Sequence, residues 1–61
     1  MTKMRKDIPY KWYEGGGFLI RYREEFDDYE LIEVPIGGGQ EERIGLFLSV
    51  DEAKKYADIL A

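Results

Sequence analysis

The residues best suited to chemistry lie in the first third of the chain, where cations alternate with aromatic rings. They are Tyr10, Lys11, Trp12, Tyr13, Arg21, Tyr22 and Arg23. Rings can stack on bases while cations neutralise phosphates, as in proteins that bind single-stranded nucleic acid. A small domain also needs its large aromatic side chains inside, so we expect Trp12 and Tyr22 to belong to the core and Tyr10 and Tyr13 to be free to lie outside.

Groups for nucleophilic catalysis are scarce. The sequence has no histidine and no cysteine, and its only serine and threonine are Ser49 and Thr2. Ser49 precedes Val50-Asp51-Glu52, a pattern typical of a helix cap rather than of a nucleophile. The usual pairs of nucleophile and base therefore cannot be assembled within one chain, and we expect a protein without catalytic residues.

Carboxylates gather in residues 24–33, but nothing nearby would bury one of them and raise its pKa for acid–base work. The stretch also lacks the alternate spacing and the glycine of a calcium loop. The two glycine triplets, 15–17 and 37–39, lead into no helix and carry no P-loop lysine, so they read as hairpin turns. We therefore expect neither a metal nor a cofactor.

Strand patterns recur between these turns. Residues 8–14 are rich in aromatics, and 18–23 alternate between apolar and polar. Residues 24–28 form an acidic turn, 29–36 resume the strand pattern, and 43–48 make the last strand. The side chains expected to point inward are Phe18, Ile20, Tyr22, Ile32, Val34, Ile36, Ile44, Leu46 and Leu48.

A helix is predicted to begin after Ser49. Ser49 and Glu52 form a capping box, in which the serine hydroxyl accepts from the Glu52 amide and the Glu52 carboxylate accepts from the Ser49 amide. One arc of the helix carries Val50, Ala53, Tyr56, Ala57 and Leu60. The predicted fold class is α+β, an antiparallel sheet of about four strands followed by one C-terminal helix (ββββα).

One helix can cover only one face of such a sheet. By alternation we expect the other face to carry Leu19, Arg21, Arg23, Leu31, Glu33 and Phe47. A surface that mixes apolar and charged side chains is typical of dimer and ligand interfaces. With Lys11, Trp12 and Tyr13, this face is the candidate surface for a partner or for nucleic acid.

The 61 residues allow only a small core, and without cysteine or histidine neither disulfides nor a common metal site can reinforce it. We therefore expect a homodimer. We also expect residues 1–7 to be flexible and residues 8–61 to form one domain. No apolar run of a signal peptide or membrane span occurs, so we expect a cytoplasmic protein with no membrane association.

Charge is unevenly distributed along the chain. Residues 1–23 sum to +4, whereas residues 24–61, with eleven acidic and three basic side chains, sum to −8. A molecule with one basic and one acidic region can bind a partner, or a second copy of itself, through patches of complementary charge. A protein that acts mainly by binding nucleic acid would be expected to have a basic net charge.

The stretch Gly45-Leu46-Phe47-Leu48-Ser49, which leads into the helix, resembles the transcriptional positive cofactor family. The resemblance covers the last third of the chain and implies a single-stranded-DNA-binding domain that dimerises through helix and sheet. It would give Lys11, Arg21 and Arg23 the phosphate contacts. Two features of this chain depart from that family's pattern. The loop at Gln40–Glu42 is acidic, and Ala53 stands in place of a large aromatic residue.

Two functions follow from these patterns. The first is a non-enzymatic, acidic binding module that occupies a protein partner stoichiometrically, as a regulator, adaptor or inhibitor, with viral inhibitors as an analogy. The alternative is a single-stranded nucleic-acid binder associated with transcription or replication.

Overall fold

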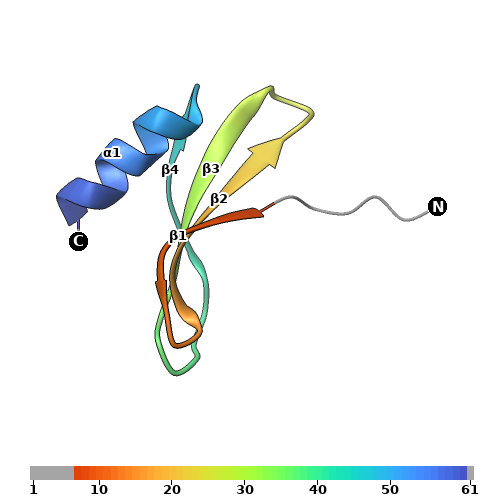
Figure 1. Ribbon diagram of the computed structural model, residues 1–61. Coiled ribbons are helices and arrows are strands. Elements are labelled where there is room, and N and C mark those ends of the chain that lie inside the picture. The colour runs from red at the N-terminus through yellow and green to blue at the C-terminus, as the bar shows by residue number, and fades with distance from the viewer. Residues whose placement is uncertain (1–6, 61) are drawn as a thin grey trace.

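The computed structural model describes residues 7–60, which form four antiparallel strands and one C-terminal helix (Figure 1). The elements are β1 (Asp7–Tyr13), β2 (Gly16–Arg23), β3 (Asp28–Val34), β4 (Glu42–Phe47) and α1 (Val50–Leu60). Each strand pairs with its neighbours along the chain, in the order β1-β2-β3-β4. The predicted ββββα fold is confirmed. The segment predicted to be flexible, 1–7, lies outside the described residues except for Asp7, which opens β1 and pairs with Arg21.

The first hairpin turns at Glu14 and Gly15, one residue earlier than the glycine triplet suggests. Both residues have positive φ angles, 49° and 81°, as the central pair of a type I′ turn requires. Gly16 already belongs to β2, where a Cβ atom would lie 2.6 Å from the Cα of Ile36. The triplet thus serves both a tight turn and a close approach of two backbones.

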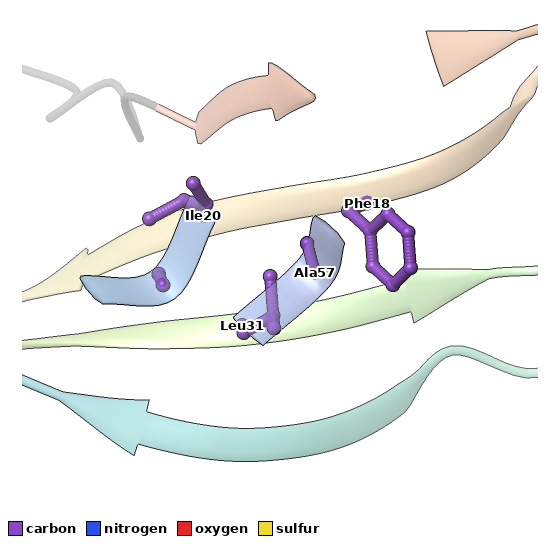
Figure 2. Close-up of a cluster of buried hydrophobic side chains, with 5 residues drawn as sticks. Phe18, Ile20, Leu31 and Ala57 are labelled. Carbon is purple, nitrogen blue, oxygen red and sulfur yellow. The ribbon is translucent and has the colours of Figure 1, made fainter. Parts of the chain in front are cut away.

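The core lies between the sheet and α1, which packs against β2, β3 and β4. Its buried members are Phe18, Ile20, Leu31, Ala53 and Ala57. Figure 2 shows the strand side chains gathered around the helical alanine Ala57. Alanine has no side chain beyond Cβ, so the helix backbone can come close to the sheet and Ile20 and Leu31 are fully buried.

The predicted orientation of β3 and β4 is wrong at several residues. Leu31 pairs with Ile20 and is buried under the helix, and the Phe47 ring lies 5.5 Å from that of Tyr56 on the helix. Neither Leu31 nor Phe47 therefore lies on the uncovered face. Leu46, predicted inward, is 44% exposed on that face.

Register explains these differences. β3 has apolar residues in both alternation phases, and pairing with β2 decides the phase by setting Tyr29 opposite Tyr22 and hence Leu31 opposite Ile20. In β4 the register shifts at Ile44, because Arg43 pairs with Ile32 while Gly45 pairs with Leu31. Such a bulge interrupts the two-residue alternation of side chains between the faces, so alternation along the sequence does not give the face of residues beyond it. The same phase places Ile32 and Val34 on the uncovered face and Glu33 on the helix side.

The predicted helix cap is confirmed, with one change. The amide of Glu52 donates to the Ser49 hydroxyl at 3.2 Å. The Glu52 carboxylate accepts from the Leu48 amide at 3.3 Å rather than from that of Ser49. The Glu52 amide is one that the helix start leaves unpaired, and the Leu48 amide lies just before the cap, so the two bonds together fix where the chain leaves β4.

Candidate functional site

The side of the sheet opposite α1 is called here the open face. Strand pairing places on it Asp7, Pro9, Leu19, Arg21, Arg23, Asp28, Glu30, Ile32, Val34, Arg43 and Leu46. Three predicted surface residues, Leu19, Arg21 and Arg23, are brought together there. Lys11, Trp12 and Tyr13 lie elsewhere, at the end of β1.

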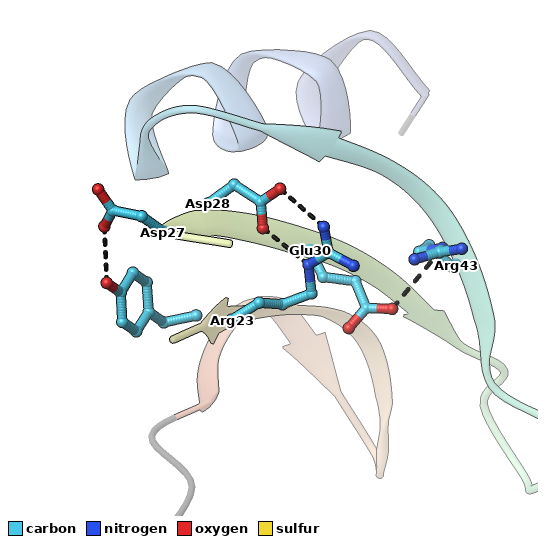
Figure 3. A network of polar contacts seen from close by, with 6 residues as sticks. Arg23, Asp27, Asp28, Glu30 and Arg43 are labelled. Carbon is cyan, nitrogen blue, oxygen red and sulfur yellow. Dashed lines mark hydrogen bonds and ion pairs between the residues drawn. The ribbon is translucent and has the colours of Figure 1, made fainter. Parts of the chain in front are cut away.

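Each arginine of the open face is paired with a carboxylate on a neighbouring strand. Arg21 donates to both carboxylate oxygens of Asp7 at 3.0 Å. Arg23 donates to both oxygens of Asp28 at 2.7 and 2.8 Å (Figure 3). The Nε atom of Arg43 lies 3.8 Å from the Oε2 atom of Glu30. The open face therefore carries a row of charges that neutralise one another.

The bidentate hydrogen bonds of Arg21 and Arg23 shift pKa values toward the charged forms. The hydrogen bonds from Arg23 lower the pKa of Asp28, and the Asp28 carboxylate raises the pKa of Arg23. Asp7 likewise raises the pKa of Arg21. A bidentate carboxylate occupies one edge of each guanidinium and compensates its charge, so Arg21 and Arg23 attract a phosphate less strongly than unpaired arginines would.

Apolar side chains lie among these charges. Leu19 stands opposite Pro9 on one side and Ile32 on the other. Ile32 is only 3% exposed although α1 lies on the other face of the sheet, whereas Leu46 remains 44% exposed. The open face thus has the mixed composition predicted for an interface, with Ile32 and Leu46 in place of Leu31 and Phe47.

Lys11 points to the helix rather than to the open face. Lys11 and Trp12 together oppose Gly17, which makes a bulge, and Lys11 has a φ angle of 52°. Its ammonium group lies 3.1 Å from the Asp58 carboxylate, which also accepts from the Tyr10 hydroxyl at 2.8 Å. These hydrogen bonds raise the pKa of Lys11 and lower that of Asp58. The bulge therefore ties the edge of the sheet to α1.

The aromatic rings divide between core and surface. Phe18 is buried as predicted, and Tyr13 is 65% exposed as expected of a ring free to lie outside. Trp12 is exposed, contrary to the expectation that it belongs to the core. Tyr22 is also exposed, although its ring contacts that of Tyr29 at 5.2 Å. An exposed surface of Trp12 and Tyr13 thus lies beside the paired Lys11.

Within residues 7–60, no three acidic side chains come together as a candidate metal site. The part of the chain that the structure describes also has no helix long and apolar enough to cross a bilayer. Ser49 acts as the helix cap.

Sequence reasoning missed the carboxylates of the open face. The sequence predicts Asp7 in a flexible start, Asp28 in an acidic turn and Glu30 in a strand without a partner, whereas all three pair with arginines across strands. The signal was present in the register, because a turn over residues 24–27 sets Arg23 opposite Asp28 and Arg21 opposite Glu30. Opposite charges facing each other across strands stabilise a sheet.

No family model, no curated protein and no solved structure matches this chain. The resemblance to the transcriptional positive cofactor family stays a prediction.

Proposed function

We propose that this chain is a non-enzymatic binding module that acts by stoichiometric interaction with a protein partner through its open face. The observation that carries this proposal is the mixture on that face of apolar side chains and internally satisfied ion pairs, such as Arg21 with Asp7 and Arg23 with Asp28. Partly apolar surfaces with few uncompensated charges suit the centre of a protein–protein interface. The absence of histidine and cysteine from the sequence supports a non-enzymatic role.

A protein suits this face better than a nucleic acid does. The cations predicted to contact phosphates, Lys11, Arg21 and Arg23, are all engaged by carboxylates of the chain itself. The sequence contains nine basic and thirteen acidic side chains, a formal net charge of −4. Phosphates would be repelled by this excess, whereas a partner with a basic rim around an apolar centre would be attracted.

Charge and size together favour a regulator, adaptor or inhibitor that masks a basic surface of its partner. A short acidic chain can do so by occupancy alone, without chemistry. Viral inhibitors are one class that works in this way, and the cytoplasm is the compartment we propose.

The proposal is tested by affinity capture with quantitative mass spectrometry, comparing the wild-type chain with Leu19→Glu and Leu46→Glu. We expect one protein to be recovered in equimolar amount by the wild type and lost with both variants. Lys55→Ala, at an exposed position of α1, is the matched control, because it lowers the net charge by one unit as each open-face variant does, without touching the open face. A partner retained by both open-face variants, or no partner above background, would count against the proposal.

Exposed rings beside Lys11 favour the alternative, a single-stranded nucleic-acid binder. Trp12 and Tyr13 are available for stacking. Titration of the Trp12 fluorescence with single-stranded oligonucleotides at low and moderate salt separates the two functions. Saturable quenching that weakens steeply with salt would favour nucleic acid. We expect no saturable change, because the neighbouring cation is already paired with Asp58.

A further inference from the structure

The two edges of the sheet differ in how they are protected. On β1, Pro9 lacks a backbone N–H and the bulge at Lys11 interrupts the strand, both of which discourage pairing with another strand. Tyr10 and Lys11 also bind Asp58 of α1, so polar and charged side chains link the helix to this edge.

The edge at β4 has fewer such features. Its bulge lies at Ile44, and beyond it Gly45 to Phe47 pair regularly with β3. This stretch contains no proline and no charged side chain. Leu46 is exposed, and Leu48, just past the strand, is 79% exposed. An apolar edge with free backbone groups is a template for another strand.

The helix presents an apolar flank above this same edge. The Tyr56 ring contacts that of Phe47, which places Tyr56 on the β4 side of α1. Ile59, three residues later, lies about 60° further round the helix from the sheet and extends this flank toward solvent, with 75% of its side chain exposed. The opposite flank carries Lys54 and Asp58, which lie against Tyr10 of β1. Only the β4 side therefore combines an apolar edge strand with an apolar helix flank.

We propose that a second copy of this chain occupies the β4 edge. The two β4 strands pair antiparallel about a two-fold axis and join the two sheets into one of eight strands. Because that axis is perpendicular to the sheet, both helices lie on the same face. Tyr56 and Ile59 of one copy then meet their counterparts across the axis.

Self-complementarity favours a second copy over a different strand. A two-fold interface brings the same patch onto itself, and an apolar flank meets this condition without further matching. Charges allow it too: in every antiparallel register centred between Ile44 and Leu46, neither Glu42 nor Arg43 falls opposite a like charge. The dimer leaves most of the open face free, so it is independent of the partner proposed above.

Sedimentation velocity over micromolar to millimolar concentrations tests the dimer. We expect the wild type to dimerise reversibly and Ile59→Glu to weaken association by at least about tenfold, since a carboxylate would be buried at the axis. Tyr13→Glu is the matched control. It makes the same change of charge at a side chain about as exposed as Ile59, at the end of β1 and away from β4. A monomeric wild type, or a dimer unaffected by Ile59→Glu, would overturn the proposal.

Cysteine crosslinking locates the interface independently. The natural chain has no cysteine, so single cysteines can be placed at Arg43, Leu46 or Leu48 near β4 and at Pro9 on the other edge. We expect at least one β4 variant to form a disulfide-linked dimer on mild oxidation and Pro9→Cys to stay monomeric. A dimer linked through Leu19→Cys and through none of the β4 variants would place the second copy on the open face and refute the β4 arrangement.

Discussion

The two faces of one sheet are built by different means. On β2, Ile20 points to the helix and is fully buried, while its neighbour Arg21 points to the open face and binds Asp7. The covered face gains stability from apolar area removed from water. Within residues 7–60, no second layer packs on the open face, which arranges charges in cross-strand pairs that each contribute little to stability. Folding therefore depends mainly on one face, which leaves the other free to be shaped for binding.

The largest expected effect tests this division directly. Leu31 and Ile32 are adjacent, both are buried, and they lie on opposite faces. Leu31→Ala should lower the free energy of unfolding by about 3 kcal/mol, because the substitution would leave a cavity at a fully buried position under α1. Ile32→Ala should cost about 2 kcal/mol, because the Leu19 and Arg43 side chains beside it can move into the space. Urea denaturation measures both values.

An equal loss for the two variants would show that the open face is itself covered, by a partner or by another part of the chain. Leu31→Met keeps an apolar side chain of similar volume and serves as the control, with an expected loss below about 1.5 kcal/mol.

The next effect concerns the helix that makes the covered face. Ser49→Ala removes the hydroxyl that accepts from the Glu52 amide. We expect a loss of about 1 kcal/mol in unfolding free energy, and Ser49→Asp, which keeps an acceptor, should restore most of it. Equal stability of Ser49→Ala and the wild type would mean that packing of Ala53 and Ala57 alone determines where the helix starts.

Much of the fold could be predicted because its signals are local. The Ser49–Glu52 cap, the turn residues and the alternation of Phe18 and Ile20 all act over a few positions. The phase of β3 and β4 depends instead on register. Leu31 and Ile32 offer apolar residues in both phases, and the bulge at Ile44 cannot be read from composition.

The candidate site was predicted only in part for the same reason. Leu19, Arg21 and Arg23 lie on β2, whose alternation is regular, and the structure places them on the open face as expected. Phe47 follows the bulge and was assigned to the wrong face. A separate bulge, in β1, turns Lys11 toward Asp58, a residue 47 positions later in the chain that no local pattern connects with it. Whether a basic residue is free to bind a phosphate therefore depends on carboxylates that only the folded chain brings next to it.

A smaller effect measures one ion pair of the open face. Arg21 and Asp7 are partly buried, with side chains 17% and 24% exposed. A double-mutant cycle with Arg21→Met and Asp7→Asn should give a coupling energy below about 1 kcal/mol. The coupling should fall as salt is added, because partly exposed charges are screened. A coupling as large as the loss in Leu31→Ala would contradict the view that stability comes mainly from the covered face.

The smallest effect lies where the covered face extends beyond the helix. Tyr22 is on that face but exposed, and its hydroxyl donates to the Asp27 carboxylate at 2.6 Å. This hydrogen bond raises the pKa of Tyr22 from 10.0 to about 12. The unfolded chain loses the proton near pH 10, so the stabilisation is complete below that pH and is lost as the pH rises from 10 to about 12.

Near-ultraviolet absorbance follows the ionisation of the tyrosines. The Asp58 carboxylate also raises the pKa of Tyr10, so the titration of Tyr22 is obtained as the difference between the wild type and Tyr22→Phe. We expect that difference to be centred near pH 12, and to move toward 10 in Asp27→Ala, which lacks the acceptor. A difference centred near pH 10 in the wild type would mean that the hydrogen bond does not persist in water. The exposed end of the covered face would then be held by the ring contact between Tyr22 and Tyr29 alone.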